Sequence, residues 1–278
     1  MTPEPRQRDD YSDRQTEAAR RVLVDLGQVL ASFADCLVVV GGWVPDLLLP
    51  EAEELHVGSI DVDLALDAAK LGDGRYAELL QLLLATRRYR PGEKAFQLVV
   101  DVDLQDGGVP VAVEVEFLAP KEVRLAKNTP KLVEGFRVLQ TEGCAVAFEA
   151  PVDFEISGRN VRGADNTVRL RVASLADFLV MKALAIGGRD KPKDSYDSCY
   201  CLANGVDTPG QLAEIWQART PQRLLAMALG ILREKFATVN AFGPQQVVEF
   251  YDSPDPEERA MQARRAYELV QEFLRRFG

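Results

Sequence analysis

Apolar residues recur along the chain at two spacings, and the pattern changes near residue 173. From residue 12 to 34, apolar positions three and four apart predict an amphipathic helix. Short apolar runs, such as Leu37–Val40 and the segment 59–66, are typical of buried strands. From Ser174 onward the spacing is helical. The pattern predicts an α+β fold with an α/β front half and a helical C-terminal half.

Strands and helices are expected to alternate in the first part of the chain, and only helices are expected in the second part. The expected strands are 36–40, 59–66, 95–104 and 110–118. The last two are joined by Gln-Asp-Gly-Gly, which is typical of a hairpin. The expected helices are 12–34, 42–49, 73–88, 174–187, 193–204, 209–217, 221–237 and 255–277. We expect two domains, an α/β domain at 1–173 and a helical domain at 174–278 that completes a cleft.

The net charge and the lack of long apolar runs limit the kinds of molecule that the chain is expected to bind. The formal net charge of −10 excludes a general electrostatic attraction to nucleic acid, so a nucleic-acid partner would need a local basic patch. The sequence has no apolar run long enough to span a bilayer, and its polar N-terminus lacks the apolar stretch of a signal peptide. We expect a cytoplasmic protein without a membrane partner.

Cysteine and histidine positions exclude several kinds of site. The four cysteines show no disulfide or zinc spacing, and we interpret Cys199 and Cys201 as buried or partly buried helix residues. The single histidine, His56, leaves no basis for His-rich metal sites or Ser-His-Asp hydrolysis. His56 lies in a polar loop just before the expected strand of Asp61, and we interpret it as a surface loop residue, with a supporting role near a phosphate as the alternative.

The most informative stretch combines a glycine pair with two aspartates. Gly41 and Gly42 end the first apolar run, where glycine lets the backbone approach a ligand and the next helix presents free N–H groups to a phosphate. Asp61 and Asp63 lie one residue apart on the next expected strand. They would share one face with Cα atoms ~7 Å apart, a spacing that suits a divalent cation or a pair of cations.

A second acidic pair follows on the strand 110–118. Glu114 and Glu116 share a face of this strand. If the strand lies beside that of Asp61 and Asp63, one glutamate would complete a three-carboxylate site that holds Mg²⁺ against a triphosphate. The third carboxylate would also accept a proton from an attacking hydroxyl. The alternative is a half-exposed strand with charges on its solvated face.

The helical half carries a basic cluster. Lys182 lies on an otherwise apolar helix face, so it either extends outward to solvent or points into a cleft. The next loop adds the cations Arg189, Lys191 and Lys193. Asp194 is expected to be the N-cap of the following helix. The cluster favours a phosphate contact, and a solvated loop is the alternative.

These residues carry a resemblance to a known family. Gly41-Gly42-Trp43 with Ser59-Ile60-Asp61-Val62-Asp63 resembles the signature of the DNA polymerase β-like nucleotidyltransferases. The segment SLADFLVMKALAIGGRDKPKDSYD is similar to the second half of the AbiEii-type nucleotidyltransferases, where Lys-Asp-x-x-Asp opens a helix. That family includes toxins of abortive-infection and toxin–antitoxin systems, among them the MenT toxins. Some members transfer nucleotides to the acceptor end of tRNA.

The resemblance implies a nucleotidyltransferase-type mixed sheet flanked by helices and followed by the helical C-terminal half, together with a set of site residues. The implied metal ligands are Asp61, Asp63 and Glu116, with Glu114 as the alternative, for two Mg²⁺ ions or for Mn²⁺. The implied nucleotide-binding residues are Gly41, Gly42, Ser59, Lys182, Arg189 and Lys193. Asp194 would orient Lys182 or help to build the cleft, and both residues are counted as catalytic with the three carboxylates. The family usually has aspartate as the third carboxylate, where this strand offers glutamates.

The resemblance leaves three functions open. The first is a Mg²⁺-dependent nucleotidyltransferase toxin that moves a nucleotide from an NTP to RNA such as tRNA, or to protein, with an antitoxin as partner. The second is a nucleotidyltransferase acting on a small molecule such as an aminoglycoside, which would suit the acidic charge. The third is a decayed nucleotide- or RNA-binding module. Basic residues that could contact RNA are Lys121, Arg124, Lys127, Lys131, Arg137, Arg159, Arg162, Arg169 and Arg171.

Overall fold

The computed structural model describes residues 4–67, 70–71, 75–121, 138–205, 210–219 and 222–278. Contacts between Cα atoms divide the chain into two compact units. The sheet unit comprises the described parts of Ser12–Val44 and Gly58–Ser174. The helical unit comprises the described parts of Met1–Tyr11, Pro45–Val57 and Leu175–Gly278.

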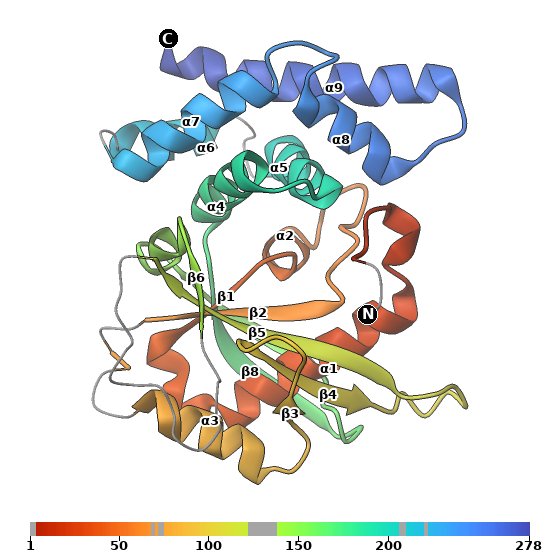
Figure 1. Ribbon diagram of the computed structural model, residues 1–278, viewed down its shortest axis with the longest axis vertical. Helices are drawn as coiled ribbons and strands as arrows, with labels where there is room; N and C mark the ends of the chain where they lie inside the picture. The colour runs from red at the N-terminus through yellow and green to blue at the C-terminus, as the bar shows by residue number, and fades with distance from the viewer. Residues whose placement is uncertain (1–3, 68–69, 72–74, 122–137, 206–209, 220–221) are drawn as a thin grey trace. The chain divides into compact units, whose positions relative to one another are not determined.

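The sheet unit contains one mixed sheet (Figure 1). Its strands are β1 (Leu37–Val40), β2 (Asp61–Leu66), β3 (Arg90–Pro91), β4 (Gln97–Val102), β5 (Val111–Pro120), β6 (Leu139–Thr141), β7 (Val152–Arg159) and β8 (Asp165–Val172). Their order is β3-β4-β5-β2-β1-β8-β7, with β6 also pairing with β5. β2 is antiparallel to β1 and parallel to β5, and β4 and β5 form the expected antiparallel hairpin. The mixed α/β fold with a helical C-terminal part is confirmed.

Helices α1 (Asp13–Val29) and α3 (Arg75–Ala85) lie on one side of this sheet (Figure 1). Ser12 caps α1 because its hydroxyl accepts a hydrogen bond from the backbone N–H of Gln15. The expected helix 12–34 ends earlier, at Val29, and continues as the 3₁₀ helix η2 (Ala31–Cys36). The 3₁₀ helix η3 (Cys144–Phe148) completes the sheet unit, and the short helix α2 (Trp43–Leu48) follows the glycine pair.

Helices make up most of the helical unit. They are η1 (Arg8–Asp10), α4 (Leu175–Gly188), α5 (Pro192–Asn204), α6 (Gly210–Arg219), α7 (Arg223–Lys235), α8 (Phe242–Tyr251), α9 (Pro256–Leu274) and η4 (Arg275–Phe277). α4 packs on α5 and α7, and α8 packs on α5 and α9. The sequence pattern did not predict α8, because Gly243 and Pro244 in its first turn usually mark a loop. Proline is tolerated there because N–H groups of the first turn have no partner within the helix.

The start of α5 differs from the prediction. Its N-cap is Lys191 and Pro192 occupies the first helical position, which its fixed φ angle favours. Asp194 is therefore not the N-cap but lies within the first turn, where a carboxylate is still favourable to the helix dipole. Cys199 and Cys201 are buried on α5 as free thiols, which confirms that prediction. Among the described residues, no helix is both long and apolar enough to cross a membrane.

A buried ion pair ties α1 to the segment after α3 within the sheet unit. Asp25 on α1 is 1% exposed. Its carboxylate accepts hydrogen bonds from Arg88 Nη2 at 2.8 and 3.0 Å and from the Tyr89 hydroxyl at 2.8 Å. Without Asp25, the charge of Arg88 and the hydroxyl of Tyr89 would have no partner in a region that water scarcely reaches. The ion pair is therefore expected to stabilise the fold.

Asp25→Ala is expected to lower the free energy of unfolding by about 3 kcal/mol, because it leaves a guanidinium without its counter-ion. Tyr89→Phe removes one hydrogen bond and is expected to cost about 1 kcal/mol. Urea unfolding followed by circular dichroism measures both. Equal effects of the two substitutions would show that the ion pair adds nothing beyond the tyrosine hydrogen bond.

Candidate functional site

Two aspartates of β2 lie on one face of the sheet. Val62 and Leu64 are buried, whereas Asp61 and Asp63 are half-buried. Successive side chains of a strand point to opposite faces, so the two carboxylates share the face opposite to the valine and the leucine. This is the arrangement that the alternation in the sequence predicted.

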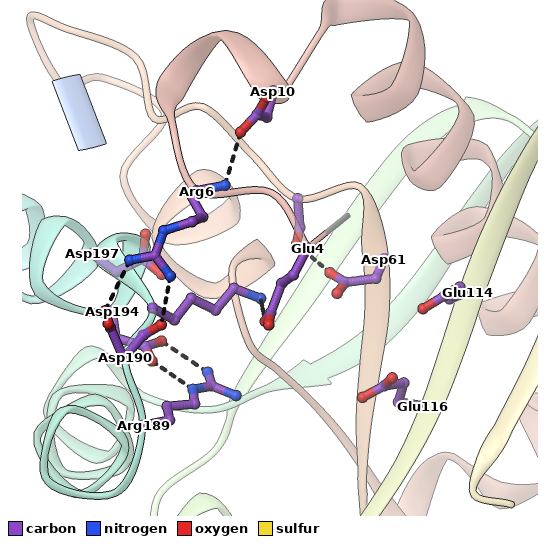
Figure 2. A network of polar contacts seen from close by, with 12 residues as sticks. Glu4, Arg6, Asp10, Asp61, Glu114, Glu116, Arg189, Asp190, Asp194 and Asp197 are labelled. Atoms are coloured by element: carbon purple, nitrogen blue, oxygen red, sulfur yellow. Dashed lines mark hydrogen bonds and ion pairs between the residues drawn. The ribbon is translucent and has the colours of Figure 1, made fainter. Parts of the chain in front are cut away.

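The two glutamates of β5 join the aspartates on that face. β5 pairs with β2 in parallel, with Asp61 opposite Glu114 and Asp63 opposite Glu116. Neighbouring strands lie ~4.8 Å apart, so partners in register present their side chains side by side. Figure 2 shows the carboxylates of Asp61, Glu114 and Glu116 directed to the same side. We call these four side chains the carboxylate face.

The glycine turn lies against the carboxylate face. Gly41 has φ +70°, a left-handed conformation that glycine adopts without strain. A Cβ atom at this position would lie 2.0 Å from Oδ2 of Asp63. A side chain at residue 41 would therefore displace the carboxylate, so glycine is required here by both conformation and space. Gly42 follows in the same turn, and α2 begins at Trp43.

Two polar contacts fix the start of β2. The indole Nε1 of Trp43 donates to the backbone carbonyl of Asp61 at 2.7 Å. The hydroxyl of Ser59 donates to Oδ1 of Asp61 at 2.5 Å, and Ser59 is buried. These bonds hold both the backbone and the carboxylate of Asp61. The sequence predicted a nucleotide-binding role for Ser59, and that role stays a prediction.

The glutamates are engaged by two side chains that the sequence analysis did not single out. Lys94 Nζ lies 2.8 Å from Oε1 of Glu116 and 3.9 Å from Oε2 of Glu114. The amide of Gln97 donates to Glu114 at 2.6 Å and to Glu116 at 3.2 Å. Burial raises the pKa of Glu114; Lys94 opposes this, and the charges of Glu116 and Asp61 add to it.

The carboxylate face has the chemistry that Mg²⁺ or Mn²⁺ requires, because these ions prefer carboxylate oxygens. Within the described parts of the chain, no three His, Cys, Asp or Glu side chains are grouped closely enough to hold a metal as they stand. The fit therefore rests on the shared face, the strand register and the close approach of Asp63 to Gly41. The metal roles of Asp61, Asp63 and Glu116 stay predictions.

The second group of predicted residues forms a buried ion network in the helical unit. Lys182 on α4 is 8% exposed. Its Nζ lies 2.7 Å from Oδ1 of Asp194 and 2.8 Å from Oδ2 of Asp197. Lys193 Nζ lies 2.8 Å from Oδ1 of Asp197, one helical turn away on α5. Arg189 forms two hydrogen bonds with the carboxylate of Asp194, at 2.7 and 2.9 Å (Figure 2).

His56 is part of this network, and the interpretation of it as a surface residue is wrong. Its side chain is fully buried, and Nε2 lies 2.9 Å from Oδ1 of Asp197. The imidazole packs against the rings of Tyr196 and Tyr200, with centroid distances of 5.4 and 4.9 Å. The partner lies 141 residues away in sequence, so local polarity did not reveal the burial.

Burial and neighbouring charges set the protonation of the network. Burial lowers the pKa of Lys182, but the charges of Asp194 and Asp197 outweigh it and the net pKa is raised. Burial would raise the pKa of Asp194, whereas Lys182 and Arg189 lower it to about 2. Burial and then the charge of Lys193 lower the pKa of His56 to about 4, so its imidazole is neutral at pH 7.

The basic residues proposed as an RNA contact are only partly described. Arg124, Lys127, Lys131 and Arg137 lie outside the described residues. Lys121 is exposed and lies 4.0 Å from Glu142. On the β7–β8 hairpin, Arg159 and Arg169 lie 4.0 and 3.5 Å from Asp165 and Glu155, so acidic neighbours offset their charge. Arg171 donates to the backbone carbonyl of Asp35 at 2.7 Å, and Arg162 lies in the hairpin turn.

Gly41→Ala is expected to lower the free energy of unfolding by about 2 kcal/mol, because it combines left-handed strain with displacement of the Asp63 carboxylate. Gly107→Ala is the matched control, since Gly107 has φ +81° but no atom within 4 Å of an added Cβ. Chemical denaturation of both variants separates strain from crowding. An equal loss in both would contradict the close approach.

Stability is expected to fall as the pH is lowered from about 6.5 to about 4. Over this interval the His56 imidazole becomes protonated in the unfolded chain but stays neutral in the folded chain. Proton binding then favours the unfolded state, so the stability that is present above pH 6.5 is lost as the pH falls. The loss attributable to His56 is roughly 3 kcal/mol.

Thermal or urea unfolding across this range measures the effect. His56→Gln keeps a hydrogen-bond donor for Asp197 but cannot titrate, so its stability should change less steeply with pH. Asp194, whose pKa is lowered to about 2, contributes a loss at lower pH. The same pH slope in wild type and His56→Gln would rule out His56 as the source.

Comparison with known sequences agrees with the geometry. The family model described as "Nucleotidyl transferase AbiEii toxin, Type IV TA system" matches residues 25–276 of the 278-residue chain. No curated protein sequence matches the chain. The family match spans both the carboxylate face and the buried ion network, and the resemblance seen in the sequence is confirmed. The chain therefore belongs to the AbiEii family of nucleotidyltransferase toxins of type IV toxin–antitoxin systems.

Proposed function

We propose that the chain is a Mg²⁺-dependent nucleotidyltransferase that moves a nucleotide from an NTP to an RNA acceptor such as tRNA. The observation that carries the proposal is the register of β2 and β5, which presents Asp61 and Asp63 beside Glu114 and Glu116. Four carboxylates on one face make a strongly anionic surface. Such a surface recruits divalent cations, and nucleotidyl transfer needs them to neutralise a triphosphate.

Asp61, Asp63 and Glu116 are the side chains we assign to hold Mg²⁺, with Glu114 as the alternative to Glu116. Bound Mg²⁺ would supply positive charge to the triphosphate and to the leaving pyrophosphate. Mn²⁺ is expected to substitute, because it accepts the same oxygen ligands. Ser59 would keep the Asp61 carboxylate in place through its 2.5 Å hydrogen bond.

In the proposed reaction, an acceptor hydroxyl oxygen attacks the α-phosphorus of the NTP. The bond between the α-phosphorus and the β-bridging oxygen breaks, and pyrophosphate leaves. Glu116 accepts the proton of the attacking hydroxyl. A glutamate at this position reaches further than the usual aspartate, so it can approach the hydroxyl from the same strand register.

We assign phosphate contacts to the glycine turn and to the helical unit. Gly41 and Gly42 would cradle the triphosphate with backbone N–H groups. Two of the three ammonium donors of Lys182 face Asp194 and Asp197, and the third would bind a phosphate oxygen. Asp194 orients Lys182 in this scheme. Arg189 and Lys193 are the other residues of the helical unit to which we assign phosphate contacts.

The family supports an RNA acceptor and an antitoxin partner, because its description is that of a toxin of a toxin–antitoxin system. The net charge of −10 supports a second candidate, a cationic small-molecule acceptor such as an aminoglycoside. A direct comparison of acceptors separates the two. In the second case the same carboxylate face would hold the metal, and only the acceptor would differ.

Incubation with Mg²⁺ and each α-labelled NTP is expected to label total tRNA and not aminoglycosides. Asp63→Asn keeps the side-chain shape but removes a ligand charge, so labelling should fall about 10³-fold. Asp165→Asn is the matched control, since the Asp165 side chain is 91% exposed on β8 and lies outside the carboxylate face. Scintillation counting of the separated acceptors gives the rates.

Expression of the wild type in bacteria is expected to arrest growth, and Asp63→Asn is expected to relieve the arrest. Labelling of aminoglycosides alone would favour the second candidate. Nucleotide binding without labelling of any acceptor would favour a decayed binding module. Full labelling by Asp63→Asn would remove the metal assignment.

A further inference from the structure

A cation of the chain itself, the ammonium of Lys94, lies next to the carboxylate face. Lys94 lies in the turn between β3 and β4, whose geometry is set by backbone hydrogen bonds from Gly92 N to Gln97 O at 2.9 Å and from Gln97 N to Lys94 O at 3.1 Å. β4 pairs with β5, and Gln97 lies opposite Glu116 in that pairing. The turn therefore places Lys94 next to the glutamates.

The contacts of Lys94 are directed at the pair of glutamates. Its ammonium lies 2.8 Å from Glu116 and 3.9 Å from Glu114, and it also lies 5.7 Å from the ring of Phe96. Burial lowers the pKa of Lys94, but the hydrogen bond with Glu116 and the charges of Glu114 and Asp61 raise it overall. The ammonium thus lies within ion-pair distance of both glutamates of the carboxylate face.

Gln97 completes the arrangement without adding charge. Its side chain is 1% exposed, and its amide donates to both glutamates. A Cβ on Gly92 would lie 2.4 Å from Oε1 of Gln97, so the amide is closely packed against the turn. Gln97 fixes where the glutamate oxygens lie, and Lys94 supplies the positive charge that they need when no other cation is near.

We propose that Lys94 is an internal counter-ion of the carboxylate face that competes with the divalent cation for Glu116, and so sets the affinity of the site for metal. This inference rests on the proposed function, because it assumes that the carboxylate face holds the metal. Lys94 is a positioning residue in this scheme: it acts on the metal through the glutamates.

Electrostatics gives the direction of the effect. An ammonium 2.8 Å from a carboxylate satisfies much of the charge that would otherwise attract a metal ion, and the two cations repel each other. The side chain of Lys94 is 54% exposed, whereas that of Glu116 is 14% exposed. The lysine can therefore move into solvent at low cost when a metal arrives, while the glutamate stays in place. Removing the lysine charge should tighten metal binding.

Titration of the full chain with Mn²⁺ in the absence of nucleotide, followed by electron paramagnetic resonance, tests the proposal. Lys94→Met should bind Mn²⁺ about three- to tenfold more tightly than the wild type, as expected for loss of one partly solvated charge. Lys94→Arg keeps the charge and should bind like the wild type. Lys70→Met is the matched control for net charge, because Lys70 contacts Asp35 and Asp67, outside the carboxylate face.

Thermal unfolding supplies a second readout. Without metal, Lys94→Met should melt below the wild type, because the two glutamates lose their counter-ion. Added Mg²⁺ should raise its melting temperature more than it raises that of the wild type, since stabilisation grows with affinity. Lys94→Gln repeats the test with a polar side chain in case the methionine variant folds poorly.

The outcomes separate this inference from the proposed function. If the wild type binds Mn²⁺ and Asp63→Asn does not, while Lys94→Met binds no more tightly than the wild type, the counter-ion role is wrong and the metal site stands. If Lys94→Met leaves Mn²⁺ affinity unchanged but weakens nucleotide binding, Lys94 is a phosphate ligand instead. If no variant binds Mn²⁺, the metal site and the counter-ion role both fall.

Discussion

The register between β2 and β5 is the constraint on which the proposed chemistry depends. It is fixed by apolar side chains: Val62 and Leu64 alternate with the aspartates, and their partners Val115 and Phe117 are fully buried. A shift of one residue would turn the carboxylates into the core and the valines into solvent, which the burial of apolar area opposes strongly. The core of the sheet unit thereby specifies which four carboxylates stand together. Their mutual repulsion is the cost, and Lys94, Gln97 and Ser59 offset it with one charge and several hydrogen bonds.

The lysines and aspartates of the ion network in the helical unit are buried, in contrast to the half-exposed carboxylate face. Lys182, Lys193, Asp194 and Asp197 are each less than a tenth exposed, and every carboxylate meets a cation at 2.7–2.8 Å. Buried ions of this kind are costly to desolvate and lose far more when one partner is removed than they contribute as a set. The neutral imidazole of His56 donates to Asp197 without adding a charge to the cluster. The network therefore holds α4, α5 and the segment of His56 in a fixed arrangement within this unit.

Periodicity in the sequence was sufficient for most elements and for one face of the candidate site. The alternation of Asp61 and Asp63 with buried residues is a local property, so it could be predicted. The sequence analysis could only assume that β5 lies beside β2, because the pairing of strands that are distant in sequence has no local sequence pattern. His56 and Lys94 were missed for the same reason, since their partners lie 141 and 22 residues away. Helix α8 was missed because Gly243 and Pro244 are loop residues by local rules, and a proline is tolerated in a helix only in the first turn.

Both units contain paired carboxylates, and the lysines that pair with them differ in exposure. Asp194 and Asp197 are almost fully buried and hold lysines that are themselves buried, so releasing either lysine would leave an unpaired charge without solvent. Glu114 and Glu116 hold a lysine whose side chain is more than half exposed and whose ammonium can be hydrated at once when it leaves. A lysine that is hydrated at once leaves its carboxylates at a lower cost than a lysine that is buried. Arg189, the other cation of the buried network, is 53% exposed, so this contrast holds for the lysines and not for every counter-ion. For the metal site proposed above, the exposure of Lys94 is thus a physical reason why its glutamates can exchange one cation for another, whereas Lys182 and Lys193 stay with their aspartates.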